Sequence, residues 1–233
     1  MVFETVLVEQ RDGVRYITLN RPDALNALNF QLIDDLLSSL EECSGDQEVR
    51  AAVIAGAGRA FCSGDDLKSM STPEYPGPEN ELVRVRDGYP LLLKRLRQLR
   101  IPVIAKVQGY ALGAGCDLVL ACDFAIAANE AIFGLSEINW GILPGGLVSK
   151  MVSDMFRPRD AMFYACTGRT FDGKKAAEMG LVNFSVPLKD LKRETLKLAR
   201  ELLEKNPNVL RGTKHAIRKT RNMSWDDAAD YLA

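Results

Sequence analysis

The sequence predicts an α/β protein, and two observations carry that prediction. Between residues 50 and 186, short apolar runs rich in β-branched residues alternate with glycine-containing turns and helix-like stretches, which is the pattern of an α/β fold. From residue 188 onward the spacing is that of helices alone. We therefore expect a core over residues 1–187 and a helical region over residues 188–233, a usual place for an oligomerisation surface.

The predicted strands lie in the first four fifths of the chain. Residues 6–8 and 14–19 alternate apolar and polar side chains around Asp12-Gly13, which predicts a hairpin. Asn29 is the expected N-cap of a helix with a stripe of leucines. Apolar runs predict further strands over residues 51–55, 101–107, 124–127, 131–133 and 181–186.

Helices are predicted from apolar periodicity and from capping signals. Asp172 is the expected cap of a helix that Gly180 ends, and Ser224 with Asp227 has the spacing of a capping box. Residues 69–80 contain three prolines and predict a loop, either a lid or a surface insertion. The expected helices cover residues 81–99, 147–156, 173–179, 188–203, 207–220 and 224–232.

Composition disfavours several classes of function. The net charge is −1 without a basic block, so we expect neither nucleic acid nor a membrane as a partner. No apolar run approaches the ~20 residues of a transmembrane helix, and the N-terminus lacks a signal-peptide pattern, so we expect a cytoplasmic protein. No His/Cys cluster has metal-ligand spacing, and we expect no metal. His215, the single histidine, is expected on a solvated helix face.

The stretch from residue 101 to residue 146 holds the candidate functional residues. Gly109, Gly113 and Gly115 follow a predicted buried strand and precede an apolar run that predicts a helix. Glycines there let the backbone turn and let another group approach it closely. The N–H groups of the first helical turn can then hold a phosphate or an oxyanion. A nucleotide-phosphate loop is the less favoured of the two, because neither G-x-G-x-x-G nor G-x-x-x-x-G-K-[ST] occurs.

Two carboxylates lie in the same stretch. Asp117 comes about one helical turn after Ala114, and Glu137 lies in a loop punctuated by Gly and Pro. Burial among apolar residues would raise their pKa values toward the range of a general acid or base. The alternative is structural, with Asp117 capping its helix and Glu137 paired with an arginine. Spacing alone does not decide between these alternatives.

Four segments together resemble the crotonase superfamily, the enoyl-CoA hydratases and isomerases: ITLNRPDALNAL, VIAGAGRAFCSGDDLK, IPVIAKVQGYALGAGCDL and CDFAIAANEAIFGLSEINWGILPGG. The resemblance covers nearly the whole chain, in order. It implies a spiral of repeated strand–strand–helix units, followed by helices that build a homotrimer or a dimer of trimers. It also implies an acyl-CoA thioester as substrate, with no cofactor other than the coenzyme A that enters as part of it.

The resemblance assigns roles to individual residues. Backbone N–H groups of Asp65 and Ala114 would hold the thioester oxygen as an enolate forms. Asp117 and Glu137 would add water across the 2,3 double bond, although Asp117 is one methylene shorter than the family's usual Glu. The family's contacts to CoA fall on Ala24, Ser63, Asp65, Leu67 and Trp140. The alternative for Ala24 and Leu67 is simple packing, and for Trp140 it is the core or the wall of the acyl pocket.

Within the family, SEINWGILPGGLVSK and TGRTFDGKKAAEMGLVN resemble the hydroxycinnamoyl-CoA hydratase-lyases, which hydrate feruloyl-CoA and cleave it to vanillin and acetyl-CoA. Three departures favour a plain hydratase: the subfamily's serine is Asp117 here, and its two phenol-binding tyrosines fall at Met70 and Ala233. Hydratase-lyase chemistry, isomerase chemistry and a catalytically silent acyl-CoA-binding subunit remain open. Family members usually continue past Asp-Tyr-Leu, so we expect either a truncated sequence or a member without the helices that cover CoA.

Overall fold

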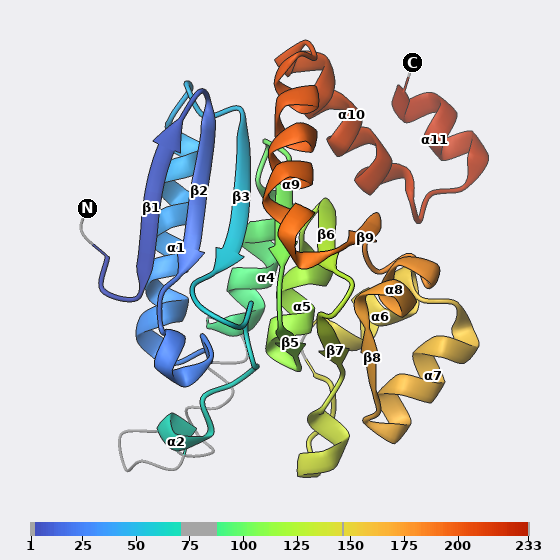
Figure 1. Ribbon diagram of the computed structural model, residues 1–233. Coiled ribbons are helices and arrows are strands. Elements are labelled where there is room, and N and C mark those ends of the chain that lie inside the picture. Colours follow the sequence, from blue (N-terminus) through green and yellow to red (C-terminus); the bar gives the residue numbers. More distant parts are fainter. Residues whose placement is uncertain (1–2, 71–87, 146, 233) are drawn as a thin grey trace.

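A six-stranded sheet forms the centre of the computed structural model, which describes residues 3–70, 88–145 and 147–232. Its first strand pairs antiparallel with the second, and the other neighbouring strands run parallel (Figure 1). In spatial order the strands are β1 (Val6–Arg11), β2 (Val14–Leu19), β3 (Ala51–Gly56), β4 (Val103–Val107), β6 (Phe124–Ala128) and β9 (Phe184–Val186). The predicted hairpin of β1 and β2 is confirmed, with Asp12 and Gly13 at positive φ in the turn.

A second, smaller sheet gives the fold its spiral character. It consists of β5 (Tyr110–Leu112), β7 (Ile132–Gly134) and β8 (Thr170–Asp172), in that order. A bridge between Cys62 and Ala111 adds the segment after β3 to its edge. The segments that follow β3, β4 and β6 therefore each add a bridge or a strand to this second sheet. This arrangement confirms the repeated units expected from the resemblance.

The helices carry the predicted caps. The Asn29 side chain accepts from the N–H of Leu32, Asp172 accepts from Lys175, and Ser224 Oγ accepts from the N–H of Asp227. The helices are α1 (Phe30–Gly45), α2 (Leu67–Met70), α4 (Tyr89–Gln98), α5 (Ala114–Ala121), α6 (Val148–Met155), α7 (Pro158–Thr167), α8 (Gly173–Glu178), α9 (Leu188–Leu203), α10 (Pro207–Thr220) and α11 (Trp225–Leu232), with 3₁₀ turns η1 (Pro22–Ala24) and η2 (Glu137–Trp140).

Apolar side chains pack on both faces of the large sheet. Along β3, Ala52 and Ile54 join the main core with the leucines of α1 and α4, while Ala51 and Val53 join a second core with Ala199 of α9. Successive strand residues point to opposite faces, so an unbroken apolar strand needs cover on both. The strand predicted over residues 51–55 is accordingly confirmed as one buried on both faces.

Several predicted boundaries are wrong. The last strand begins only at Phe184, because Leu181 and Val182 are buried in a turn that follows Gly180 at φ +80°. Helix α7 was not predicted, since Tyr164 is the single side chain that it buries and its apolar periodicity is weak. The strands β5 and β8 were not predicted, because three residues are too few to show a period. Glu137 is the first residue of a 3₁₀ turn rather than part of an open loop. Residues 71–87, which hold most of the predicted lid, lie outside the described residues.

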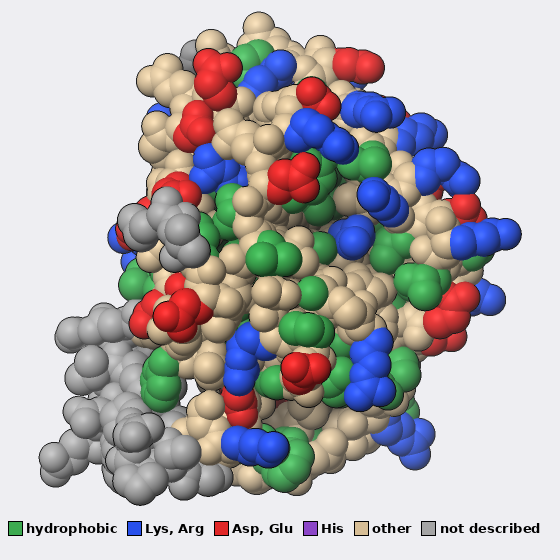
Figure 2. All heavy atoms as spheres, turned by 60° about the vertical axis from the view of Figure 1, so that its left-hand side comes forward, with side chains coloured by type: hydrophobic (Ala, Val, Ile, Leu, Met, Phe, Trp, Pro, Cys, Tyr) green, Lys and Arg blue, Asp and Glu red, His purple; other side chains and the backbone are tan. Residues whose placement is uncertain are grey.

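The C-terminal helices α10 and α11 lie beside the core and contribute no buried residue (Figure 1). Large apolar side chains project from them to the exterior: Val209, Ile217, Trp225 and Leu232. Acidic and basic side chains are interspersed over the face drawn in Figure 2, in keeping with a net charge of −1. None of the helices in the described ranges is long and apolar enough to cross a membrane.

Candidate active site

The glycine-rich start of α5 is packed closely against the second layer. All eight residues of α5 are buried, and Gly113 occupies the N-cap position with φ +48°. A Cβ on Gly115 would lie 2.2 Å from the carbonyl oxygen of Cys62, so a larger residue cannot be accommodated without a backbone shift. The N–H of Ala114, at the first position of the helix, has no acceptor within the helix.

The Gly64 turn meets the start of α5. Gly64 has φ +100°, and a Cβ built on it would lie 2.9 Å from the Leu112 oxygen and 3.7 Å from the Ala114 nitrogen. Asp65, the next residue, forms a parallel bridge with Leu28 and has an exposed side chain. The fold thus brings together the two backbone segments to which the resemblance assigns the oxyanion donors, and the role itself stays a prediction.

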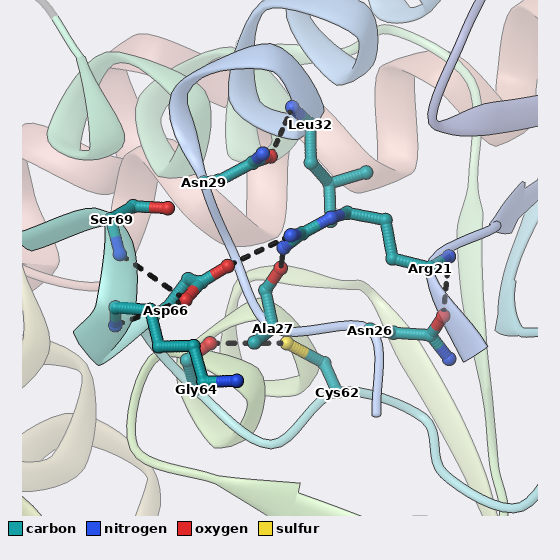
Figure 3. A network of polar contacts seen from close by, with 10 residues as sticks. Arg21, Asn26, Ala27, Asn29, Leu32, Cys62, Gly64, Asp66 and Ser69 are labelled. Atoms are coloured by element: carbon teal, nitrogen blue, oxygen red, sulfur yellow. Dashed lines mark hydrogen bonds and ion pairs between the residues drawn. The ribbon is translucent and has the colours of Figure 1, made fainter. Parts of the chain in front are cut away.

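A polar network fixes the Gly64 turn, and Figure 3 shows Arg21 at its centre. Arg21 Nη2 pairs with Asp66 Oδ2 at 2.8 Å, and its Nη1 donates to the carbonyl of Ala27. The N–H of Leu28 donates to the Gly64 oxygen at 2.8 Å. Burial raises the pKa of Asp66, but the bond and charge of Arg21 together with the bonds from the N–H groups of Ser69 and Lys68 outweigh it and hold the pKa below its usual value. Sequence reasoning gave Arg21 no role, because its partner is 45 residues away.

Asp117 is buried on α5 with 1% of its surface exposed. Its Oδ2 accepts from the Tyr89 hydroxyl at 3.1 Å, and its Oδ1 has no hydrogen-bond partner among the described residues. Burial raises the pKa of Asp117 well above its usual value, the charge of Glu137 adds to the rise, and the Tyr89 bond opposes it. The alternative in which Asp117 caps its helix is wrong, because Gly113 holds that position.

Glu137 is the first residue of η2 and lies near Gly113. A Cβ on Gly113 would lie 3.8 Å from Glu137 Oε1, so the carboxyl group lies beside the start of α5. Its Oε2 is buried without a partner among the described residues, and none of the ion pairs described for this chain includes Glu137. Burial raises the pKa of Glu137, and the charge of Asp65 contributes to the rise. The arginine partner of the structural alternative is absent from the described part of the chain.

Tyr89, at the first position of α4, completes the cluster and was missed at the sequence level. Its hydroxyl lies 2.9 Å from the carbonyl oxygen of Ala114 and 3.1 Å from Asp117 Oδ2. Burial and the charge of Asp117 raise the pKa of Tyr89 well above its usual value. No motif or spacing signal joins residues 89 and 117, which only the packing of α4 against α5 brings together.

The predicted CoA contacts lie in segments that follow the strands β2, β3 and β7. Ala24 lies half-buried in η1 after β2, and Ser63, whose N–H donates to Leu25 at 3.1 Å, follows β3. The core alternative for Trp140 is wrong, since 61% of its surface is exposed, and Leu67 is 41% exposed at the start of α2. Ligands commonly bind beyond the carboxyl ends of parallel strands.

The structure also bears on His215, on a metal site and on the positions of the two phenol-binding tyrosines. His215 lies exposed on α10 with Nε2 2.8 Å from the Tyr231 hydroxyl, which confirms the solvated helix face. No group of three or more His, Cys, Asp or Glu residues is arranged to hold a metal within the described ranges. The Met70 side chain and Ala233, where the two phenol-binding tyrosines would fall, lie outside the described residues.

Comparison with known proteins gives one consistent result. The profile of the enoyl-CoA hydratase/isomerase family matches residues 9–230. The chain is 46% identical to hydroxycinnamoyl-CoA hydratase-lyase of Pseudomonas fluorescens, over 99% of this chain and 84% of that protein. It is 35% identical to 2,3-dehydroadipyl-CoA hydratase of Escherichia coli K12, over 94% and 84% respectively.

The fold agrees with these sequence relationships. A crystal structure of enoyl-CoA hydratase from Bacillus anthracis superposes with a TM-score of 0.92 at 30% identity, covering 97% of this chain and 87% of that one. The spiral core is therefore shared with a solved enoyl-CoA hydratase. The chain belongs to the enoyl-CoA hydratase/isomerase family of enzymes.

Proposed function

We propose that this enzyme adds water across the 2,3 double bond of an enoyl-CoA thioester. The observation that carries the proposal is a pair of carboxyl groups beside the glycine-rich start of α5, that of the buried Asp117 and that of the half-buried Glu137. Each has one oxygen without a partner among the described residues, and Glu137 raises the pKa of Asp117, so the two groups interact. Two interacting carboxyls with raised pKa values suit a reaction that needs an acid and a base together.

The thioester oxygen would be held by the main chain. The N–H groups of Asp65 and Ala114 belong to segments that meet at Gly64, and the positive end of the α5 dipole lies behind Ala114. As the oxygen becomes an enolate, a donor of this kind contributes about 3–4 kcal/mol to the transition state. Withdrawal of electron density makes the β-carbon electrophilic.

The carboxyl pair would then move the protons. One carboxylate takes a proton from water as its oxygen bonds to the β-carbon, and the protonated partner gives a proton to the α-carbon. The water supplies both the added hydroxyl and the net added proton, so the reaction balances without an oxidant, a reductant or a metal. We propose no cofactor beyond the coenzyme A of the substrate, for which Ala24, Ser63, Leu67 and Trp140 are the proposed contacts.

Oligomerisation is part of the proposal. The exposed apolar side chains of α10 and α11, among them Ile217 and Trp225, support a homotrimer or a dimer of trimers built through these helices. We also propose a cytoplasmic location, which the five free cysteines support.

A second candidate is hydroxycinnamoyl-CoA hydratase-lyase activity, favoured by the 46% identity to the Pseudomonas fluorescens enzyme. The two are separated by incubating the protein with crotonyl-CoA and, separately, with feruloyl-CoA. The absorbance of the conjugated thioester and the masses of the products are followed.

Hydration of crotonyl-CoA alone is the expected result and establishes a general hydratase. Vanillin formed from feruloyl-CoA would favour hydratase-lyase activity. A shifted double bond without added water would indicate an isomerase. Binding of both thioesters without turnover of either would contradict catalysis and leave an acyl-CoA-binding protein.

A further inference from the structure

The Tyr89 hydroxyl has one proton and two acceptors. The carbonyl oxygen of Ala114 lies 2.9 Å away and Asp117 Oδ2 lies 3.1 Å away. A carbonyl can only accept, whereas a carboxyl group accepts when ionised and can donate when protonated. The hydroxyl proton can therefore point to either neighbour, and the protonation state of Asp117 determines to which of them it is donated.

Both arrangements satisfy the cluster. When Asp117 is ionised, Tyr89 donates to Oδ2 in a charge-assisted hydrogen bond. When Asp117 is protonated on Oδ1, its Oδ2 is a carbonyl oxygen that still accepts from Tyr89. When the proton lies on Oδ2, that oxygen donates to the Tyr89 oxygen, and the tyrosine turns its own proton to Ala114. Neither side chain has to leave its place, because the change needs only the gain or loss of the Asp117 proton and, where that proton lies on Oδ2, rotation of the Tyr89 hydroxyl about its C–O bond.

Building on the proposed function, we propose that Tyr89 is a positioning residue that keeps Asp117 fixed in both of its protonation states during turnover. The tyrosine holds Oδ2 and leaves Oδ1, which has no partner among the described residues, as the oxygen directed at the reacting water. An acid/base group must change charge in each cycle, and a side chain that moved with each change would lose its alignment.

The charged surroundings make this support necessary. Glu137 and Asp65 face Asp117 with like charge, and the buried thiols of Cys62 and Cys116 lie within range of the carboxyl. Burial and both acids disfavour the ionised form, and the bond from Tyr89 is the single described contact that favours it. Loss of the hydroxyl therefore removes the stabilisation of the carboxylate.

The test compares Tyr89→Phe with Tyr164→Phe. The second variant removes the hydroxyl of a buried tyrosine on α7, whose ring centroid lies 4.5 Å from that of Phe171. With crotonyl-CoA, Tyr89→Phe is expected to lower kcat about 10- to 100-fold with KM nearly unchanged. The limb of the pH profile that reports Asp117 should move to higher pH. Tyr164→Phe should change neither. An unmoved pH profile in Tyr89→Phe would overturn the proposal.

A second measurement does not depend on activity. Carbon-13 NMR of carboxyl-labelled aspartate follows the titration of Asp117, whose signal is assigned by its loss in Asp117→Asn. The midpoint should be higher in Tyr89→Phe than in the parent protein, and an equal midpoint would contradict the proposal. If the parent protein hydrates no enoyl-CoA, the proposed function fails while the titration still tests the role of Tyr89.

The double variant separates positioning from folding. Once Asp117→Asn has removed the titrating group, adding Tyr89→Phe should lower the residual activity by less than threefold. A full repeat of the loss seen in the single variant would show that Tyr89 acts through something other than Asp117.

Discussion

Helices α5 and α10 differ in how much of each helix is buried. Every residue of α5 is buried, including Asp117, whereas α10 buries none of its residues. Helix α5 lies within the core and begins where Gly113 and Gly115 let the backbone approach the second layer. A carboxyl group held there with an unpartnered oxygen costs stability, and such a cost is typical of a functional site.

Helix α10 is attached by ion pairs and by the half-buried Leu210, which packs against the second core. Lys214 and Arg218 both pair with Asp123, each at 2.6 Å, while Ile217 points outward. One chain thus brings Asp117, Glu137 and Tyr89 together, whereas α10 presents apolar side chains that the described residues leave exposed. Three substitutions, at Gly115, Asp117 and Ile217, test that contrast.

Close packing at the start of α5 should make Gly115→Ala the most damaging small substitution. Its Cβ would lie 2.2 Å from a backbone oxygen, so we expect the free energy of unfolding to fall by about 3 kcal/mol. The matched control is Gly212→Ala in α10, where no atom lies within 4 Å of the added Cβ and stability should be equal or higher by up to about 1 kcal/mol. Urea unfolding measures both, and equal losses would contradict the contrast.

The buried charge of Asp117 should appear in the pH dependence of stability. The folded state raises the pKa of Asp117, so between the usual value of about 3.9 and the raised one the folded protein holds a proton that the unfolded chain releases. The contribution of Asp117 to stability therefore falls as pH rises through that window. Asp117→Asn removes the fall, so we expect the variant to gain stability relative to the parent as pH rises through that window.

Thermal unfolding at several pH values measures this gain. Asp226→Asn, an exposed position on α11, is the control and should show the same pH dependence as the parent. A stability difference between Asp117→Asn and the parent that stays constant with pH would mean that the Asp117 carboxyl is not held in its neutral form.

Substitution of Ile217 by Lys on the outward side of α10 should have the smallest effect on the fold. Stability at low protein concentration should change by less than about 0.5 kcal/mol, because the side chain is 66% exposed. Light scattering should instead report a lower mass than that of the parent. An unchanged mass would mean that α10 is not part of the proposed interface.

Much of the fold could be predicted from the sequence, because long periodic segments carry their own signal. The bounds of α9 and α10 match the prediction, and the caps at Asn29 and Asp172 have their expected partners. Helix α7 could not be predicted, since it buries only Tyr164. Its position depends on contacts with other elements rather than on a pattern of its own.

The candidate site, like the fold, was only partly predictable from the sequence. Asp117, Glu137 and the glycines lie in one stretch and were identified from local chemistry. Tyr89 and Arg21 were missed, because their importance comes from partners 28 and 45 residues away along the chain. Such contacts follow from tertiary packing and have no periodic or motif signal in a single sequence.

The central claim is that Glu137 is an acid/base group of a hydratase, and Glu137→Gln tests it most directly. We expect kcat for crotonyl-CoA to fall about 10²- to 10⁴-fold, because the amide cannot exchange a proton. Calorimetric binding of a non-reactive saturated acyl-CoA should stay within a few-fold of the parent value. Turnover at the parent rate in Glu137→Gln would contradict the account.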